Sequence, residues 1–410
     1  MNNTPELLSP AGDLDKMRFG IAYGADAVYM AGTRFGMRAA ATNFDDNALR
    51  EGIAYAHAHG VKCYITVNIM PSNRDLPALP AYLELLQDAG ADALIIADVG
   101  VLRMARRYAP KVPVHISTQT SILNHEAANY WADEGAERIV LARELSLEEI
   151  AEIRAKTPKE LEIEAFVHGA MCISYSGRCL ISQYMTGRDA NHGACAQPCR
   201  WNYSLMEEKR PGQFFPVEED GRGTYLYNSK DMCMIEHVPE LIEAGITSFK
   251  IEGRNKTAYY AACVTGAYRA AIDTYKKDPE NFVLPQFCRD EVNKVSHREY
   301  YTGFYFGSEE NGQHYGDSQY IREYEVVGMP VECDDSGKAV FALKNRFFDG
   351  EELELIQPGQ APYVFRAENV TDDEGTKREL FNVPQMRVHF AFPFKVSEWA
   401  ILRKVKERPE

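Results

Sequence analysis

The phrase YGADAVYMAG (23–32) decides the fold, because similar phrases follow it along the chain: AGADALIIADVG (89–100), EGAERIVLAREL (134–145) and AGITSFKIEGR (244–254). Each phrase follows a stretch with a helical pattern, then has a glycine, then a short apolar run. Glycine ends helices because it adopts the left-handed conformation at low steric cost. The apolar runs, such as 93–97, do not alternate with polar residues, which is typical of strands covered on both faces in a parallel sheet.

Further strands are expected between these phrases, at 63–68, 114–118 and 163–168. Amphipathic helix patterns separate them. From residue 7 to about residue 280 the chain therefore holds about eight β–α units, which predicts an α/β protein with a (β/α)8 TIM-like barrel. The alternative, a doubly wound open sheet, usually has a G-x-G-x-x-G loop after its first strand, and this chain has no such motif.

The pattern changes near residue 320, where β-rich runs are broken by turn signals such as Asp349-Gly350 and Pro358-Gly359. We expect a small C-terminal antiparallel β-barrel domain at 318–410, with a β-sandwich as the alternative, after a barrel domain at 1–317. The basic run LRKVKER (402–408) is interpreted as a solvated helix end.

Composition restricts the class of protein. The chain has 410 residues, 45% of them hydrophobic, and a formal net charge of −15. This acidic balance argues against nucleic-acid binding unless a local basic patch exists. No apolar run is long enough for a membrane-spanning helix, and MNNTPELLSPAG (1–12) does not resemble a signal peptide, so a cytoplasmic protein without membrane contact is expected.

Polar side chains follow the predicted strands, where a (β/α)8 barrel has its functional residues. The candidates are Ser9, Asn68, Asp98, Gln119, Arg143, Glu144, His168, Lys250, Glu252 and Arg254. In SFKIEGR (248–254), Lys250, Glu252 and Arg254 alternate and so share one face of a strand. Two cations at the barrel mouth suit an anionic small molecule. The alternative is a Lys–Glu–Arg salt network that braces the barrel.

The segment HGAMCISYSGRCLISQYMTGRDANHGACAQPCRW (168–201) holds four cysteines, Cys172, Cys179, Cys195 and Cys199. The strand at 163–168 leads directly into it, so this cysteine-rich insertion, at about 169–225, is expected to begin at the barrel mouth. A long segment without helical or strand periodicity inside a compact domain is usually functional.

Four thiols in one segment can serve several purposes. Disulfides are rare in the cytosol. Zinc sites favour C-x2–4-C pairs, which Cys195 and Cys199 fit, whereas six residues separate Cys172 from Cys179. A nucleophilic cysteine paired with a histidine needs only one thiol. An iron–sulfur cluster held by four cysteines fits best, and Cys233 is an alternative fourth ligand in place of Cys199.

These motifs resemble a known family. The stretches EAFVHGAMCISYSGRCLISQY (164–184) and GACAQPCRW (193–201), together with ELLSPAG (6–12) and NSKDMC (228–233), are similar to the signature of peptidase family U32. The resemblance covers most of residues 5–307. The stretch FDGEELELIQPG (348–359) resembles the small β-barrel at the end of the longer members.

The resemblance implies two activities. Some members are described as collagenase-like peptidases, in which the cysteines would be structural. Others are iron–sulfur proteins that hydroxylate RNA bases, and the layout here is most similar to members that convert the wobble uridine of tRNA to 5-hydroxyuridine and depend on prephenate. A non-enzymatic RNA-binding or assembly protein is a third possibility.

For this chain, the RNA-hydroxylating members imply a [4Fe–4S] cluster on Cys172, Cys179, Cys195 and Cys199, and the tRNA anticodon region as partner. Prephenate, a small dicarboxylate, is then the expected co-substrate for the two cations. We expect the catalytic residues at the mouth to be His168, Lys250, Glu252 and Arg254.

Overall fold

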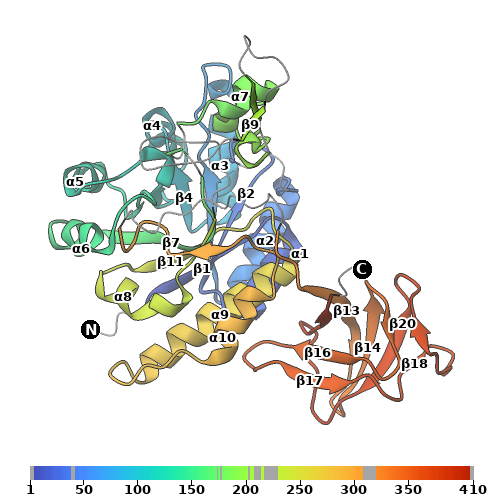
Figure 1. Cartoon of the computed structure of the whole chain (residues 1–410). Coiled ribbons are helices and arrows are strands. Elements are labelled where there is room, and N and C mark those ends of the chain that lie inside the picture. Colours follow the sequence, from blue (N-terminus) through green and yellow to red (C-terminus); the bar gives the residue numbers. More distant parts are fainter. Residues whose placement is uncertain are drawn as a thin grey trace.

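The computed structural model describes residues 4–37, 42–172, 174–175, 178–201, 204–206, 214–216, 230–307 and 320–406. Parts of the expected insertion, including 207–213 and 217–225, lie outside the described residues. Two units are visible in Figure 1, a helix-covered barrel and a smaller β domain beside it.

The barrel is a closed ring of eight parallel strands, which confirms the predicted fold class. Strand β1 pairs with β2 and with β11, the ring continues in order to β7, and β7 pairs with β11 to close it. The strands are β1 (Glu6–Pro10), β2 (Ala27–Ala31), β3 (Lys62–Val67), β4 (Ala93–Ile96), β5 (Val114–Ile116), β6 (Arg138–Val140), β7 (Glu162–Ala170) and β11 (Ser248–Ile251). Two short strands, β10 (Asp231–Cys233) and β12 (Tyr300–Tyr301), extend the sheet beyond β7.

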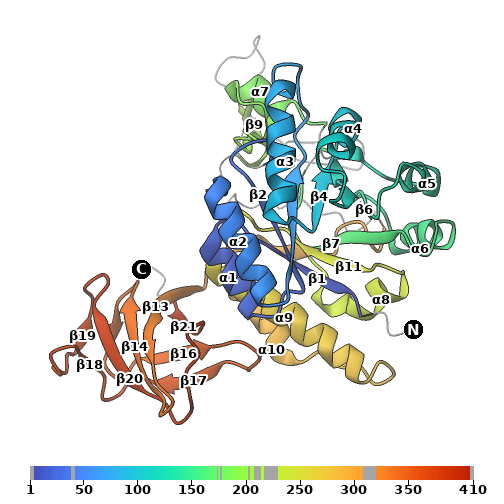
Figure 2. The same ribbon diagram turned by 180° about the vertical axis from the view of Figure 1, so that it is seen from behind.

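Helices cover the outside of the ring, as the views from both sides show (Figures 1 and 2). They are α1 (Leu14–Ala22), α2 (Asp46–Ala58), α3 (Leu79–Ala89), α4 (Val99–Tyr108), α5 (His125–Asp133), α6 (Leu147–Ala155), α8 (Val238–Glu243), α9 (Ala258–Lys277) and α10 (Gln286–Asn293). The glycines of the four repeated phrases all have positive φ: Gly24 (97°), Gly90 (84°), Gly135 (73°) and Gly245 (85°). The helix-ending role that the sequence assigned to them is therefore observed, and it sets the chain direction into β2, β4, β6 and β11.

The C-terminal unit is an antiparallel sheet curved into a half-barrel, in the strand order β17-β16-β21-β13-β14-β20-β18. Its strands are β13 (Tyr324–Cys333), β14 (Lys338–Leu343), β16 (Glu352–Ile356), β17 (Tyr363–Arg366), β18 (Thr371–Asp372), β20 (Arg387–Ala391) and β21 (Ile401–Val405). This unit has a separate apolar core that is rich in phenylalanine.

The prediction of a solvated helix end was wrong for the described part of the basic run: residues 402–405 belong to strand β21, and residues 407 and 408 lie outside the described residues. Arg403 is 0% exposed and donates to carboxylates of Glu291 on α10 and Glu354 on β16. Lys404 pairs with Glu351 at 2.9 Å. The sequence alone does not reveal these ion pairs, because the carboxylates that pair with Arg403 and Lys404 are distant in sequence.

The Arg403 network and a small aromatic contact join the two units. The guanidinium also donates to the Tyr259 hydroxyl on α9 at 3.1 Å. Trp399 packs edge-on against Phe19 of α1, with ring centroids 5.3 Å apart. Among the described residues, no helix has both the length and the apolar character needed to span a membrane.

Candidate active site at the barrel mouth

Lys250 lies inside the barrel and is bound to one carboxylate. Its Nζ is 2.6 Å from Oε1 of Glu164 on β7, and its ammonium lies 4.5 Å from the centre of the Tyr29 ring. The side chain is 5% exposed. Burial lowers the pKa of Lys250, and the neighbouring Glu164 opposes that shift. Lys250 therefore brings a dehydrated amine to the lumen, balanced by one acid.

A charged network continues below this pair toward the start of the strands. Arg138 of β6 contacts Glu6 at 2.6 Å and Glu164 at 3.0 Å. The hydroxyl of Tyr64 donates to Glu6 at 2.6 Å. A salt network does brace the barrel, as the alternative interpretation of SFKIEGR proposed, but the acid that pairs with Lys250 is Glu164 and not Glu252.

Above the pair, at the carboxyl ends of the strands, is a cavity of about 60 Å³. The lining residues are Tyr29, Met37, Thr66, Asn68, Ile95, Ser117, Thr118, Gln119, Val140, Arg143, Phe166, Lys250, Glu252 and Arg254. Arg254, 4% exposed, donates to the carbonyl oxygen of Met37. The structure thus brings together Lys250, Glu252 and Arg254, as expected from their alternation.

The same cavity includes Asn68, Gln119 and Arg143, which the strand-end rule had also selected. The Asn68 amide donates to Gln119 at 3.2 Å. Sequence reasoning missed Tyr29 and Phe166, whose rings flank the Lys250 ammonium. Alternate residues of β2 and β7 face the lumen and the surrounding helices, and this alternation could have identified Tyr29 and Phe166 as lumen residues. Both faces of a parallel strand are apolar and buried, however, so the sequence does not show which residues face the lumen.

His168 lies apart from the other three candidates. In the pairing of β7 with β11, Lys250 is opposite Phe166 but the next residue, Ile251, is opposite His168, so Val167 is an extra residue in a bulge. Bulges redirect side chains. The imidazole consequently is not part of the cavity wall and packs among tyrosines, with ring centroids 5.2 Å from Tyr300 and 5.6 Å from Tyr268.

His168 is electrically neutral in this setting. Burial lowers its pKa to about 3, and the nearby His297 and Lys256 contribute smaller effects in the same direction. Its Nε2 lies 3.3 Å from the Tyr300 hydroxyl, while Nδ1 has no hydrogen-bond partner among the described residues. At neutral pH it therefore acts as an uncharged packing and hydrogen-bonding group.

The four cysteines of 168–201 lie on the segment that follows β7. Cys172 is exposed, whereas Cys179, Cys195 and Cys199 are half-buried, and no disulfide joins cysteines of the described residues. Helix α7 (Ile181–Thr186) lies near α3 at the same end of the molecule in both views (Figures 1 and 2). A hydrogen bond from Met70 N to Asn191 O, at 3.1 Å, holds the segment to the loop after β3.

The donor chemistry of this segment fits an iron–sulfur cluster, since thiolates are the ligands such clusters use. The backbone N–H of Gln197 donates to Cys195 Sγ at 3.4 Å. Within the described parts of the chain, no three His, Cys, Asp or Glu side chains are gathered closely enough to hold a metal ion. The four thiols share a segment but do not form a compact set.

Cys233 is in a different environment. It lies on β10 opposite His168, and burial raises its pKa to about 12, with the Tyr268 hydroxyl as a hydrogen-bonding neighbour. Cys233 is therefore set apart from the other four thiols by its place on β10, outside the segment 172–199.

Fold and site together define a (β/α)8-barrel protein with a charged lumen, a cysteine segment at its mouth and a C-terminal β domain. The chain belongs to peptidase family U32. The sequence model of that family matches residues 12–315, and the model of the peptidase family U32 C-terminal domain matches residues 322–403. The resemblance seen in the motifs is therefore confirmed.

The chain is similar to proteins with names that refer to RNA hydroxylation. It is 39% identical over 406 residues to tRNA hydroxylation protein P1 of Bacillus subtilis (strain 168), covering 98% of this chain and 95% of that one. It is 37% identical to tRNA hydroxylation protein P of Escherichia coli (strain K12), with 90% of each chain covered. The E. coli 23S rRNA 5-hydroxycytidine C2501 synthase is 40% identical over 268 residues, which are 65% of this chain and 39% of that one.

Proposed function

We propose that this protein is an enzyme that hydroxylates tRNA, converting the wobble uridine of the anticodon to 5-hydroxyuridine. The observation that carries the proposal is the end-to-end similarity to relatives named tRNA hydroxylation proteins, across both domains. The name of the rRNA synthase also refers to a hydroxylated RNA base, in that case a cytidine. Anticodon-loop bases are unpaired, so such a base reaches an active site without the cost of opening a helix.

Prephenate is the proposed co-substrate. Lys250 and Arg254 face one cavity and are both nearly fully buried, so they offer two cationic groups where water is largely excluded. Charge-assisted hydrogen bonds to carboxylates are strong in such surroundings. In this proposal Lys250 and Arg254 bind the two carboxylates, and the rings of Tyr29 and Phe166 form the apolar wall beside them.

A [4Fe–4S] cluster on Cys172, Cys179, Cys195 and Cys199 completes the proposed site. When bound, such a cluster supplies one-electron transfer. Cys199 is preferred over Cys233 as the fourth ligand, because Cys199 shares one segment with the other three thiols, whereas Cys233 lies on β10, which pairs beside β7 and places it opposite His168. The cysteine segment itself would cover the mouth and keep water from the base.

Mass spectrometry of nucleosides tests the reaction. In tRNA from a strain that lacks the gene, 5-hydroxyuridine and its derivatives should be absent, and the intact gene should restore them. Unchanged nucleosides would contradict the proposal and favour the peptidase or a binding protein.

Iron and sulfide analysis after anaerobic purification tests the cluster and its ligands. The intact protein should be coloured and contain both elements; Cys199→Ser should lose most of the iron, and the matched change Cys233→Ser should keep it. A colourless protein with stoichiometric zinc would refute the cluster. Loss of iron in Cys233→Ser but not in Cys199→Ser would identify Cys233 as the fourth ligand.

A further inference from the structure

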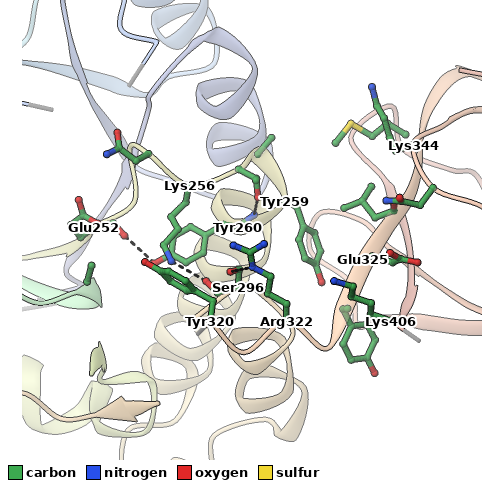
Figure 3. A pocket seen from close by; sticks show the side chains of 18 of the residues that line it. Glu252, Lys256, Tyr259, Tyr260, Ser296, Tyr320, Arg322, Glu325, Lys344 and Lys406 are labelled. Carbon is green, nitrogen blue, oxygen red and sulfur yellow. Dashed lines mark hydrogen bonds between the residues drawn. The ribbon is translucent and has the colours of Figure 1, made fainter. Parts of the chain in front are cut away.

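A second, larger cavity of about 740 Å³ lies between the barrel and the C-terminal domain (Figure 3). One wall comes from the barrel side, where Asn255 and Lys256 precede α9 and where Tyr320 and Arg322 lead into β13. The facing wall belongs to the C-terminal domain and includes Lys344. We call this space the interdomain cleft.

The cleft is basic in an acidic protein. Its described lining has four cations, Lys256, Arg322, Lys344 and Lys406, and two carboxylates, Glu252 and Glu325. The whole chain carries a net charge of −15. An acidic protein needs a local basic patch to bind nucleic acid, and the interdomain cleft is such a patch.

Two of these cations are available for a ligand. Lys344 and Lys406 are exposed and have no ion pair or side-chain hydrogen bond with other described residues. Figure 3 shows both lysines on the C-terminal side of the cleft, across from Lys256 and Arg322. A polyanion lying in the cleft would meet positive charge on both sides.

The opposite wall is held in place before any ligand binds. Lys256 Nζ donates to the Ser296 carbonyl at 2.9 Å, and Arg322 Nε donates to the Ser296 hydroxyl at 3.2 Å. Fixing long side chains in advance lowers the entropy lost on binding. Helix α9 also begins in this wall, and its amino end adds positive potential.

An aromatic ring lies among the cations. Tyr320 is half-buried, with the Lys256 ammonium 4.5 Å and the Arg322 guanidinium 5.7 Å from its ring centre. Proteins that bind unpaired RNA combine a cationic groove with aromatic rings on which bases stack.

The cleft is connected to the barrel mouth through one residue. Glu252 lines both the cleft and the small cavity that contains Lys250 and Arg254. An RNA strand in the cleft would thus lie beside the place where the base is expected to react.

We propose that the interdomain cleft is the RNA-binding site of this protein. Lys256, Arg322, Lys344 and Lys406 contact phosphates, and an unpaired base stacks on Tyr320. This inference rests on the proposed function and names the surface that holds its substrate.

Salt-dependent binding tests the phosphate contacts. The full-length protein is titrated against an unmodified, fluorescently labelled tRNA transcript at several salt concentrations, and Lys344→Gln/Lys406→Gln is compared with wild type. Losing two phosphate contacts should reduce the slope of log affinity against log salt by about 1 to 2 and weaken binding about 10-fold or more at low salt.

Lys276→Gln/Lys277→Gln is the matched control, because it removes the same charge from exposed lysines at the far end of α9. The control should bind like wild type. Equal affinity and slope in the two double variants would overturn the proposal, as would a raised KM for prephenate with unchanged tRNA affinity.

Tyr320 gives a second, charge-neutral test. Tyr320→Ala should weaken tRNA binding about 5- to 150-fold, the cost of one lost base stack, and Tyr320→Phe should retain the affinity. An alanine variant that binds like wild type would overturn the stacking role.

The test separates failure of the site from failure of the reaction. If the deletion strain keeps its hydroxyuridine but the lysine variants bind tRNA poorly, the proposed reaction is refuted and the proposed RNA-binding site is retained. If the strain loses hydroxyuridine but the lysine variants bind tRNA normally, the proposed RNA-binding site is refuted and the proposed reaction is retained.

Discussion

At the scale of single residues, the Lys250–Glu164 pair shows what sequence reasoning supplies and what it omits. Alternation in SFKIEGR correctly placed Lys250, Glu252 and Arg254 around one cavity. The partner of Lys250 is 86 positions away on another strand and carries no local signal. A buried charged side chain requires a partner, but the identity of that partner follows only from the folded ring.

Replacing Lys250 by Met should destabilise the barrel by about 3–5 kcal/mol, because one acid of a buried network loses a cation. Urea unfolding measures the loss. Lys62→Met, at an exposed position at the start of β3, is the control and should stay within about 0.5 kcal/mol. A small effect of Lys250→Met would mean that Arg138 alone compensates Glu164.

His168 should make folding sensitive to acid. Its folded-state pKa of about 3 lies below the ordinary value of about 6.5, so between these values the unfolded chain binds a proton that the folded chain does not. Stability should therefore fall as pH decreases from about 6.5 toward 3, by up to about 1.4 kcal/mol per pH unit from this residue.

The change His168→Gln should remove that contribution and flatten the dependence of unfolding free energy on pH between about 4.5 and 6. Tyr300→Phe, which keeps the imidazole, should retain the slope. An unchanged slope in His168→Gln would show that the imidazole is protonated in the folded protein.

At the scale of elements, β7 carries a feature that the sequence did not predict. Its apolar run predicted a strand that ends near residue 168, yet the observed strand continues to Ala170 and contains the bulge at Val167. Position-counting places His168 on the lumen side with Glu164 and Phe166. One extra residue reverses that assignment, and uniform burial of the strand leaves no polar alternation to reveal it.

Gly169 is expected to be essential for this arrangement. Its φ is +111°, and a Cβ built there would lie 2.5 Å from the Glu252 carbonyl oxygen. Gly169→Ala should therefore displace Glu252 and lower both thermal stability and tRNA hydroxylation. Gly187→Ala, also at positive φ but in open space, isolates the backbone strain alone and should cost only about 1–2 kcal/mol. Equal effects of the two changes would argue against a steric role for Gly169.

At the scale of the whole molecule, the two units and their order were visible in the sequence, while their junction was not. The change from β–α units to turn-rich strands near residue 320 marks the transition to the antiparallel sheet. The interdomain cleft depends on segments from 252–259, 320–329 and 344–345 meeting in space. No spacing rule in a single sequence relates such segments.

Arg403→Met should loosen the junction. Glu291 and Glu354 would stay largely buried without their guanidinium, at a cost of about 3–5 kcal/mol. Differential scanning calorimetry should show a lower or split transition, and limited proteolysis should cut faster between the units. Arg103→Met, on the exposed face of α4, is the control. A single transition at the wild-type temperature would contradict the assigned role.

The Arg403 network also has a consequence for synthesis on the ribosome. Glu291 precedes Arg403 by 112 positions, and at typical elongation rates that distance takes roughly 5–20 s to translate. During this interval the acid on α10 has Lys294, 3.6 Å away, as its neighbouring cation. The newly synthesised barrel therefore lacks the Arg403 partner of Glu291 until β21 has been made. A pause or truncation late in translation would leave a complete ring of strands in which Glu291 lacks this ion pair.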